Sequence, residues 1–132
     1  MRALRRLCLF VVVLVAAGSL LVGASSPVVR HLKLTKAEPG LDSTITEAPG
    51  SVNLYFTEAP QARGSAIMLL NEAGEEVVLE DAVQDAENGK IIRAKVTGVI
   101  APGSYDVAWR TMARDGHVVR GEYRFTFQPP NS

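Results

Sequence analysis

A histidine follows a predicted hairpin turn near the end of the chain, and the residues around it have metal-binding chemistry. Asp115 and His117 stand two positions apart across Gly116. Side chains of an extended strand repeat with a period of two, so both can point to one side, and the glycine permits a tight turn. A carboxylate oxygen beside an imidazole nitrogen is half of a site for a divalent metal such as Cu(II). Asp-Gly is also a common hairpin turn that needs no metal, so the spacing alone is weak evidence.

The other candidate ligands are few. His31, the only other histidine, begins a predicted strand, where it could equally be a solvated residue. Glu58 is most simply a polar residue that ends a strand before Pro60. Met68 and Met112 are single residues in apolar surroundings, so we predict core positions for both rather than thioether ligation. The sequence has no GxSxG, HExxH, CxxC or phosphate-loop motif, and we therefore predict no enzymatic activity.

The first 24 residues predict export. Residues 1–6 hold three arginines and no acid, and residues 7–24 form an apolar or small-residue run that ends in Val22-Gly23-Ala24. This order is typical of a secretory signal peptide, although a run of that length could also span a bilayer as an uncleaved anchor. We predict cleavage and a periplasmic or otherwise extracytoplasmic protein, which is attached to the membrane only if the segment remains uncut.

Removing this segment changes the charge of the remaining chain. The whole chain has 14 basic and 14 acidic residues, and the segment holds three of the basic ones, which leaves a net charge of about −3. A mildly acidic domain lacks the positive surface that nucleic acid binding requires. The only cysteine is Cys8, so the exported domain is predicted to have neither a disulfide nor a thiolate ligand. About 100 residues can bury a core without such cross-links.

Most of the remaining chain shows the alternation of strands separated by turn residues, and no helical period of any length. Residues 80–87 are either one polar helical turn or a loop. About seven short strands predict an all-β, immunoglobulin-like or Greek-key antiparallel β-sandwich. The predicted strands are His31–Lys36, Ser51–Phe56, Ser65–Leu70, Glu76–Leu79, Lys90–Val96, Ser104–Thr111 and a last strand with Tyr123, Phe125 and Phe127 on one face.

The segment GSYDVAWRTMARDGHVVRGEYRFTF, residues 103–127, resembles the closing segment of the copper-resistance protein C (CopC) family of periplasmic copper-binding domains. Residues 31–40 and 48–58 resemble the family's opening and second-strand patterns, so the resemblance covers residues 31–128. The chain would then divide into a signal or anchor (1–24), a short extension (25–30), a CopC-like domain (31–128) and a tail (129–132). The matching positions are Gly103, Tyr105, Val107, Trp109, Arg110, Asp115, Gly116, His117, Gly121 and Phe125.

The resemblance implies a Cu(II) site near one end of the sandwich. His31, Asp115 and His117 would be ligands, Glu58 a weak or outer ligand, and Trp109 a core residue close to the metal. The implied function is that of an exported Cu(II)-binding protein in copper resistance or homeostasis, which buffers copper or delivers it to an inner-membrane copper transporter. No nucleic acid partner is implied.

The N-terminus departs from the family pattern. In relatives of this kind the matching histidine is commonly the mature N-terminus, and its α-amine is also a copper ligand. A chain cut after Ala24 has His31 as its seventh residue. The amine then lies elsewhere, and Cu(II) binding is expected to be weaker unless the extension 25–30 is trimmed.

The second departure from the family pattern concerns Cu(I). Some relatives hold Cu(I) in a methionine-rich loop, whereas Gln61–Leu70 contains only Met68, so no Cu(I) site is predicted.

Two other functions compete with copper buffering. A metal-free immunoglobulin-like interaction module that keeps the scaffold is the main alternative. A copper oxidase built on a histidine brace is the weaker one, because it requires His31 at the N-terminus.

Overall fold

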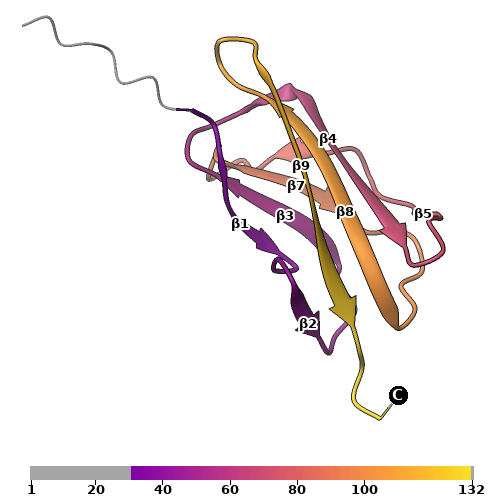
Figure 1. Cartoon of the computed structure of the whole chain (residues 1–132). Coiled ribbons are helices and arrows are strands. Elements are labelled where there is room, and N and C mark those ends of the chain that lie inside the picture. Colours follow the sequence, from indigo (N-terminus) through magenta and orange to yellow (C-terminus); the bar gives the residue numbers. More distant parts are fainter. Residues whose placement is uncertain (1–30, 132) are drawn as a thin grey trace, which may run out of the picture.

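Two β-sheets packed face to face form the domain in the computed structural model, which describes residues 31–131. The predicted signal segment and the extension 25–30 lie outside the described residues. The described strands are β1 (Leu34–Glu38), β2 (Ser43–Ile45), β3 (Ser51–Phe56), β4 (Gln61–Asn71), β5 (Glu76–Val77), β6 (Val83–Gln84), β7 (Ile91–Lys95), β8 (Gly103–Met112) and β9 (Val118–Phe127) (Figure 1).

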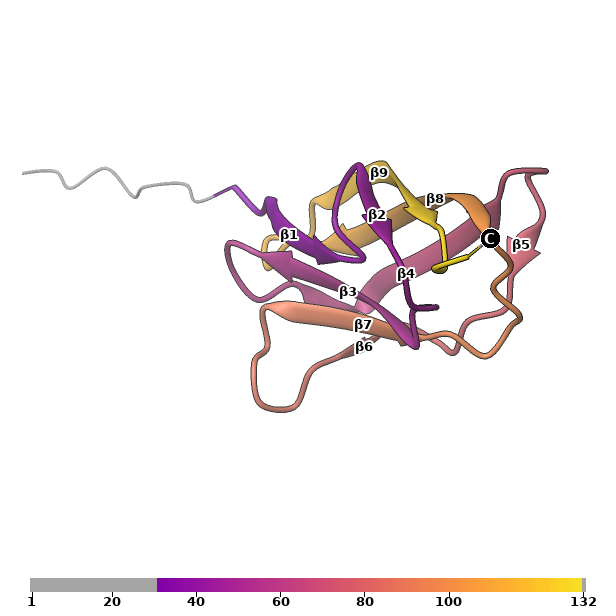
Figure 2. The ribbon, with the colours of Figure 1, turned by 90° about the horizontal axis from the view of Figure 1, so that it is seen from below.

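The two sheets divide the strands between them. One sheet has the order β1-β3-β7-β6 and the other β2-β9-β8-β4-β5, and Figure 2 shows the two layers one above the other. Neighbouring strands pair antiparallel except β2, which runs parallel to β9 through three residue pairs. The long hairpin of β8 and β9 ends beside the start of the described chain, and the C-terminus lies at the opposite end (Figure 1). The predicted all-β sandwich is confirmed.

The core is built by the strands whose alternation the sequence displays. In β3, Val52, Leu54 and Phe56 are buried while the residues between them are partly exposed. The rings of Phe56 and Trp109 meet edge to face with centroids 5.3 Å apart and join the two sheets. Burial of such alternating side chains is the main stabilising contribution to a sandwich of this kind.

Several predicted elements need correction. The described chain has nine strands rather than about seven, because β2 and β6 are too short to show alternation, and β5 covers only Glu76–Val77 of the strand predicted at Glu76–Leu79. Residues 80–87 contain strand β6 and no helical turn. The first strand begins at Leu34 instead of His31. The strand predicted at Ser65–Leu70 begins earlier, at Gln61, with an irregular register against β8 before Ala66.

The predicted core position of Met68 is wrong. Its neighbour Leu69 is fully buried, so the strand turns Met68 outward, and this methionine is 44% exposed. Met112 is half-buried at the end of β8. Among residues 31–131, no helix is long and apolar enough to cross a membrane.

Candidate metal site

The loop between β8 and β9 carries the Asp-Gly-His sequence in a hydrogen-bonded turn. The N–H of Ala113 donates to the carbonyl of His117 at 2.8 Å, and the N–H of Gly116 donates to the carbonyl of Ala113 at 3.0 Å. Gly116 has φ of +90°, a backbone conformation that favours glycine. The turn therefore presents Asp115 and His117 together at the end of the sandwich.

Asp115 and His117 contact each other twice. The N–H of His117 donates to Oδ1 of Asp115 at 3.0 Å, and Nδ1 of the imidazole lies 2.7 Å from Oδ2. These bonds, the backbone N–H first and the imidazole second, lower the pKa of the Asp115 carboxyl below its ordinary value. Asp115 is thus anionic at neutral pH. Within the described part of the chain Nε2 of His117 makes no hydrogen bond, which leaves that ring nitrogen available to a ligand.

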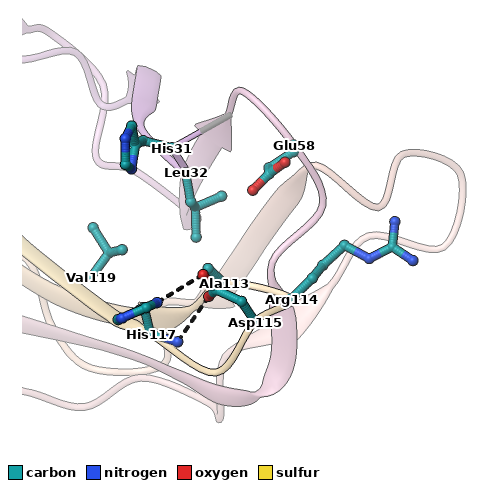
Figure 3. Close-up of a pocket in the computed structure, with 8 residues that line it drawn as sticks. All are labelled: His31, Leu32, Glu58, Ala113, Arg114, Asp115, His117 and Val119. Atoms are coloured by element: carbon teal, nitrogen blue, oxygen red, sulfur yellow. Dashed lines mark hydrogen bonds and ion pairs between the residues drawn. The ribbon is translucent and has the colours of Figure 1, made fainter. Parts of the chain in front are cut away.

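His31 and Glu58 come from the other sheet. His31 stands just before β1 and Glu58 just after β3, and these two strands are paired antiparallel. Figure 3 shows His31 and Glu58 on one side of the pocket, and Asp115 with His117 on the opposite side. His31 is exposed and Glu58 half-buried. The four predicted ligands therefore face a shared space from two directions.

That space is a cavity of about 480 Å³. Apolar side chains of Leu32, Ala113 and Val119 line it between the two polar sides, and the Arg114 side chain extends away from them (Figure 3). The sequence analysis did not single out these four residues, although each lies within two positions of a predicted ligand. The pocket thus combines imidazole and carboxylate groups with an apolar lining.

The predicted ligands line one pocket without forming a coordination group. Within residues 31–131, no three His, Cys, Asp or Glu side chains are gathered closely enough to hold a metal ion. Asp115 and His117 touch, whereas His31 and Glu58 stand apart from them. Trp109 is buried as predicted, with 8% of its surface exposed, but it does not line this pocket.

The nitrogen and oxygen groups of this pocket suit a borderline divalent ion. Imidazole nitrogen and carboxylate oxygen are ligands that Cu(II) accepts in tetragonal geometry. The lowered pKa of Asp115 supplies a negative charge without a proton to displace. The residues therefore fit such an ion chemically, and the remaining requirement is that the exposed side chains converge.

Fold and pocket together define a two-sheet β-sandwich with a histidine- and carboxylate-lined pocket where the sheets meet at one end. Residues 34–128 match the family model described as the CopC domain, and the chain belongs to this family. The predicted resemblance is thereby confirmed.

Individual relatives agree with this assignment. The chain is 31% identical over 121 residues to copper resistance protein C of Xanthomonas campestris pv. juglandis, an alignment that covers 87% of this chain and 91% of that protein. It is 26% identical over 96 residues to copper transport protein CutJ of Bacillus subtilis, covering 73% of this chain and 18% of CutJ. The crystal structure of CopC from Methylosinus trichosporium OB3b superposes with a TM-score of 0.70 at 31% identity, covering 77% of this chain and 98% of that one.

Proposed function

We propose that this chain is a copper-binding protein of copper resistance or homeostasis, and that it holds Cu(II) through His31, Asp115 and His117, with Glu58 as a weak or outer ligand. One observation carries the proposal. In a chain of the CopC family, both histidines and two carboxylates line a single pocket, although they come from sequence segments far apart.

The donor set favours Cu(II) over Cu(I). Imidazoles and carboxylates suit the harder ion, whereas Cu(I) prefers thiolates and thioethers. Cys8, the only cysteine, is in the predicted signal segment, and Met68 lies on the outer face of the β4 strand in a different groove. The pocket residues supply no sulfur ligand.

His117 and Asp115 are proposed to act as a pair. In the metal-free pocket the bond between Nδ1 and the Asp115 carboxylate fixes the ring orientation of His117, and the ion is proposed to take the place of this bond, so that both side chains bind it directly. His31 and Glu58 then approach by side-chain rotation from the other side. Copper is the cargo here, and its positive charge offsets the negative charge of the carboxylates.

The proposed role is to buffer copper outside the cytoplasm or to deliver it to a membrane transporter, without catalysis. The basic and apolar N-terminal segment supports export. The alignment with 18% of CutJ supports the link to transport, because a region similar to this chain forms part of a larger copper transport protein. The extension 25–30 implies a site built from side chains alone, unless trimming makes His31 the N-terminus.

The test is a Cu(II) titration of the chain as the cells produce it, after intact-mass and N-terminal analysis of that same material. We expect one Cu(II) per chain, with the electron paramagnetic resonance signal of nitrogen- and oxygen-bound copper. His117→Ala and His31→Ala should each remove most of the binding, and Glu122→Ala, an exposed carboxylate of β9, should leave it unchanged. A chain beginning at Ser25 that takes up no Cu(II) would contradict the proposal and favour the metal-free interaction module.

A further inference from the structure

Thr57, at the end of β3, ties the start of the described chain in place. Its hydroxyl donates to the carbonyl of His31 at 3.2 Å and accepts the N–H of Lys33 at 3.0 Å. Its own N–H donates to the carbonyl of Lys33 at 2.9 Å. Residues 31–33 precede β1, so these bonds hold the backbone of His31 where no sheet ladder does.

Gln61, the first residue of β4, holds the opposite side of the pocket in a similar way. Its side-chain amide donates to the carbonyls of Ala113 at 2.9 Å and of Arg114 at 3.3 Å. The Ala113 carbonyl also accepts the N–H of Gly116, a bond that belongs to the turn carrying Asp115. Gln61 is therefore bonded to the frame of the turn and to neither predicted ligand in it.

The residues between these two anchors are also fixed. Pro60 is buried, its ring restricts φ, and its carbonyl accepts the side-chain amide of Gln84 at 3.1 Å. Glu58 lines the pocket from this same stretch, whereas Thr57 and Gln61 do not line it. The stretch passes from the sheet of β3 to the sheet of β4, and so it crosses between the two halves of the pocket.

We propose that Thr57 and Gln61 are positioning residues that set the separation of the two halves of the copper pocket, a role that rests on the proposed function above. Thr57 fixes the half that contains His31, and Gln61 fixes the half that contains Asp115 and His117. The connecting residues 57–61 make these two positions interdependent. A pocket whose halves are already held at a fixed separation loses less conformational entropy when an ion binds between them.

The variants Thr57→Val and Gln61→Leu test this role because each removes hydrogen-bonding groups with little change in volume. We expect each to weaken Cu(II) affinity about tenfold, as loss of outer support around metal ligands generally does. Thr57→Ser keeps the hydroxyl and should bind as the wild type does. The copper resonance spectrum should broaden or shift in Thr57→Val and Gln61→Leu.

Two control variants remove comparable bonds that do not reach the pocket backbone. Thr35→Val removes a hydroxyl that donates to the carbonyl of Tyr55 on the β1–β3 pair. Thr97→Val removes a hydroxyl that donates to the carbonyl of Val78 at 3.2 Å and bonds to neither residues 57–61 nor the turn. Both should retain wild-type copper affinity. All variants are made in the full chain, and thermal unfolding without metal verifies that each is folded.

A metal-free measurement separates positioning from general instability. In Gln61→Leu, amide hydrogen exchange at Gly116 should accelerate, because the turn backbone at Ala113 and Arg114 loses the side-chain amide that anchors it. Thr97→Val should leave that exchange rate unchanged. Wild-type affinity in Thr57→Val and Gln61→Leu, in a protein that binds Cu(II), would overturn the positioning role alone. No Cu(II) binding by the wild type would overturn the proposed function as well.

Discussion

Nδ1 of His117 lies 2.7 Å from Oδ2 of Asp115, and the backbone N–H of the same histidine donates to the other carboxylate oxygen at 3.0 Å. Both side chains are largely exposed, at 83% and 59% of their surface. The pair contributes little to folding stability, because solvent screens the interaction between exposed polar and charged groups. Its geometry instead fixes which ring nitrogen of His117 is free.

Replacing Asp115 distinguishes an orienting carboxylate from a direct ligand. Asp115→Asn keeps an oxygen that can accept from the imidazole, and Asp115→Ala keeps none. Because Asp115 is proposed as a direct ligand, both variants should lose most of the Cu(II) affinity, since neither the amide nor the methyl group supplies a charged oxygen. Competitive titration against a chelator measures both. Tighter binding by the Asn variant than by the Ala variant, with a loss of only about 10- to 100-fold in the latter, would instead indicate that the carboxylate mainly orients His117.

Gly121→Ala should destabilise the fold. A Cβ at this position would lie 2.5 Å from Cζ2 of Trp109, its cross-strand partner, and the indole is held in the core. We expect a loss of about 1–3 kcal/mol in the free energy of unfolding, as overpacking generally causes. Urea unfolding measures it. Gly50→Ala is the control, since its Cβ would meet nothing within 4 Å, and a loss there as large as at Gly121 would contradict the steric explanation.

Removal of the hydroxyl should affect folding stability differently at two buried tyrosines. Tyr123 is buried and its hydroxyl has no hydrogen-bond partner among the described residues, and burial raises the pKa of that phenol. Tyr123→Phe should leave stability unchanged or raise it. Tyr105 donates to the carbonyl of Ala101 at 2.6 Å, so Tyr105→Phe should cost about 0.5–1.5 kcal/mol. Thermal unfolding of both variants is the measurement, and equal losses would show that Tyr123 has a partner in solution.

Asp106 and Arg124 form a cross-strand pair whose contribution to stability should depend on pH. Two parallel bonds of 2.7 and 2.8 Å link them, and the Arg124 guanidinium lowers the pKa of Asp106 below its ordinary value of 3.8. A carboxyl whose pKa is lower in the folded than in the unfolded state stabilises the fold at pH values above its unfolded-state pKa. This stabilisation is lost as the pH falls through its folded-state pKa.

Asp106→Asn should therefore be less stable than the wild type at about pH 7, by less than about 1 kcal/mol because the pair is partly exposed. The difference should shrink as pH falls below the ordinary pKa of 3.8 and disappear once the folded-state carboxyl is protonated. Urea unfolding at pH 7 and over the acidic range measures it, and the double variant with Arg124→Gln isolates the pair. A difference that persists at acidic pH would assign the effect to something other than charge.

Sequence reasoning predicted the fold where side chains alternate over several residues. Strands β3, β8 and β9 have buried and exposed positions in the expected phase, because a two-residue period is visible over six or more residues. Strand β2 was missed, since three residues show no period and its parallel partner β9 lies far along the chain.

The candidate site was predictable only in part. The local spacing of Asp115 and His117 indicated that they share a face, and they are in contact. That His31 and Glu58 would face the same pocket followed from the family resemblance, because their proximity depends on the pairing of β1 with β3. The proposed role of Thr57 and Gln61 was not predictable from the sequence, since their side chains donate to backbone carbonyls 26 and 52 positions away.

The pocket joins the two layers of the sandwich at one end, with His31 and Glu58 on one sheet and Asp115 and His117 on the other. An ion held by both sides would act as a reversible cross-link in a domain that has no cysteine, because Cys8, the only cysteine of the chain, is in the predicted signal segment. Such a link stabilises the native state in proportion to the logarithm of free copper over its dissociation constant. The unfolding temperature of the protein would then report the copper activity around it.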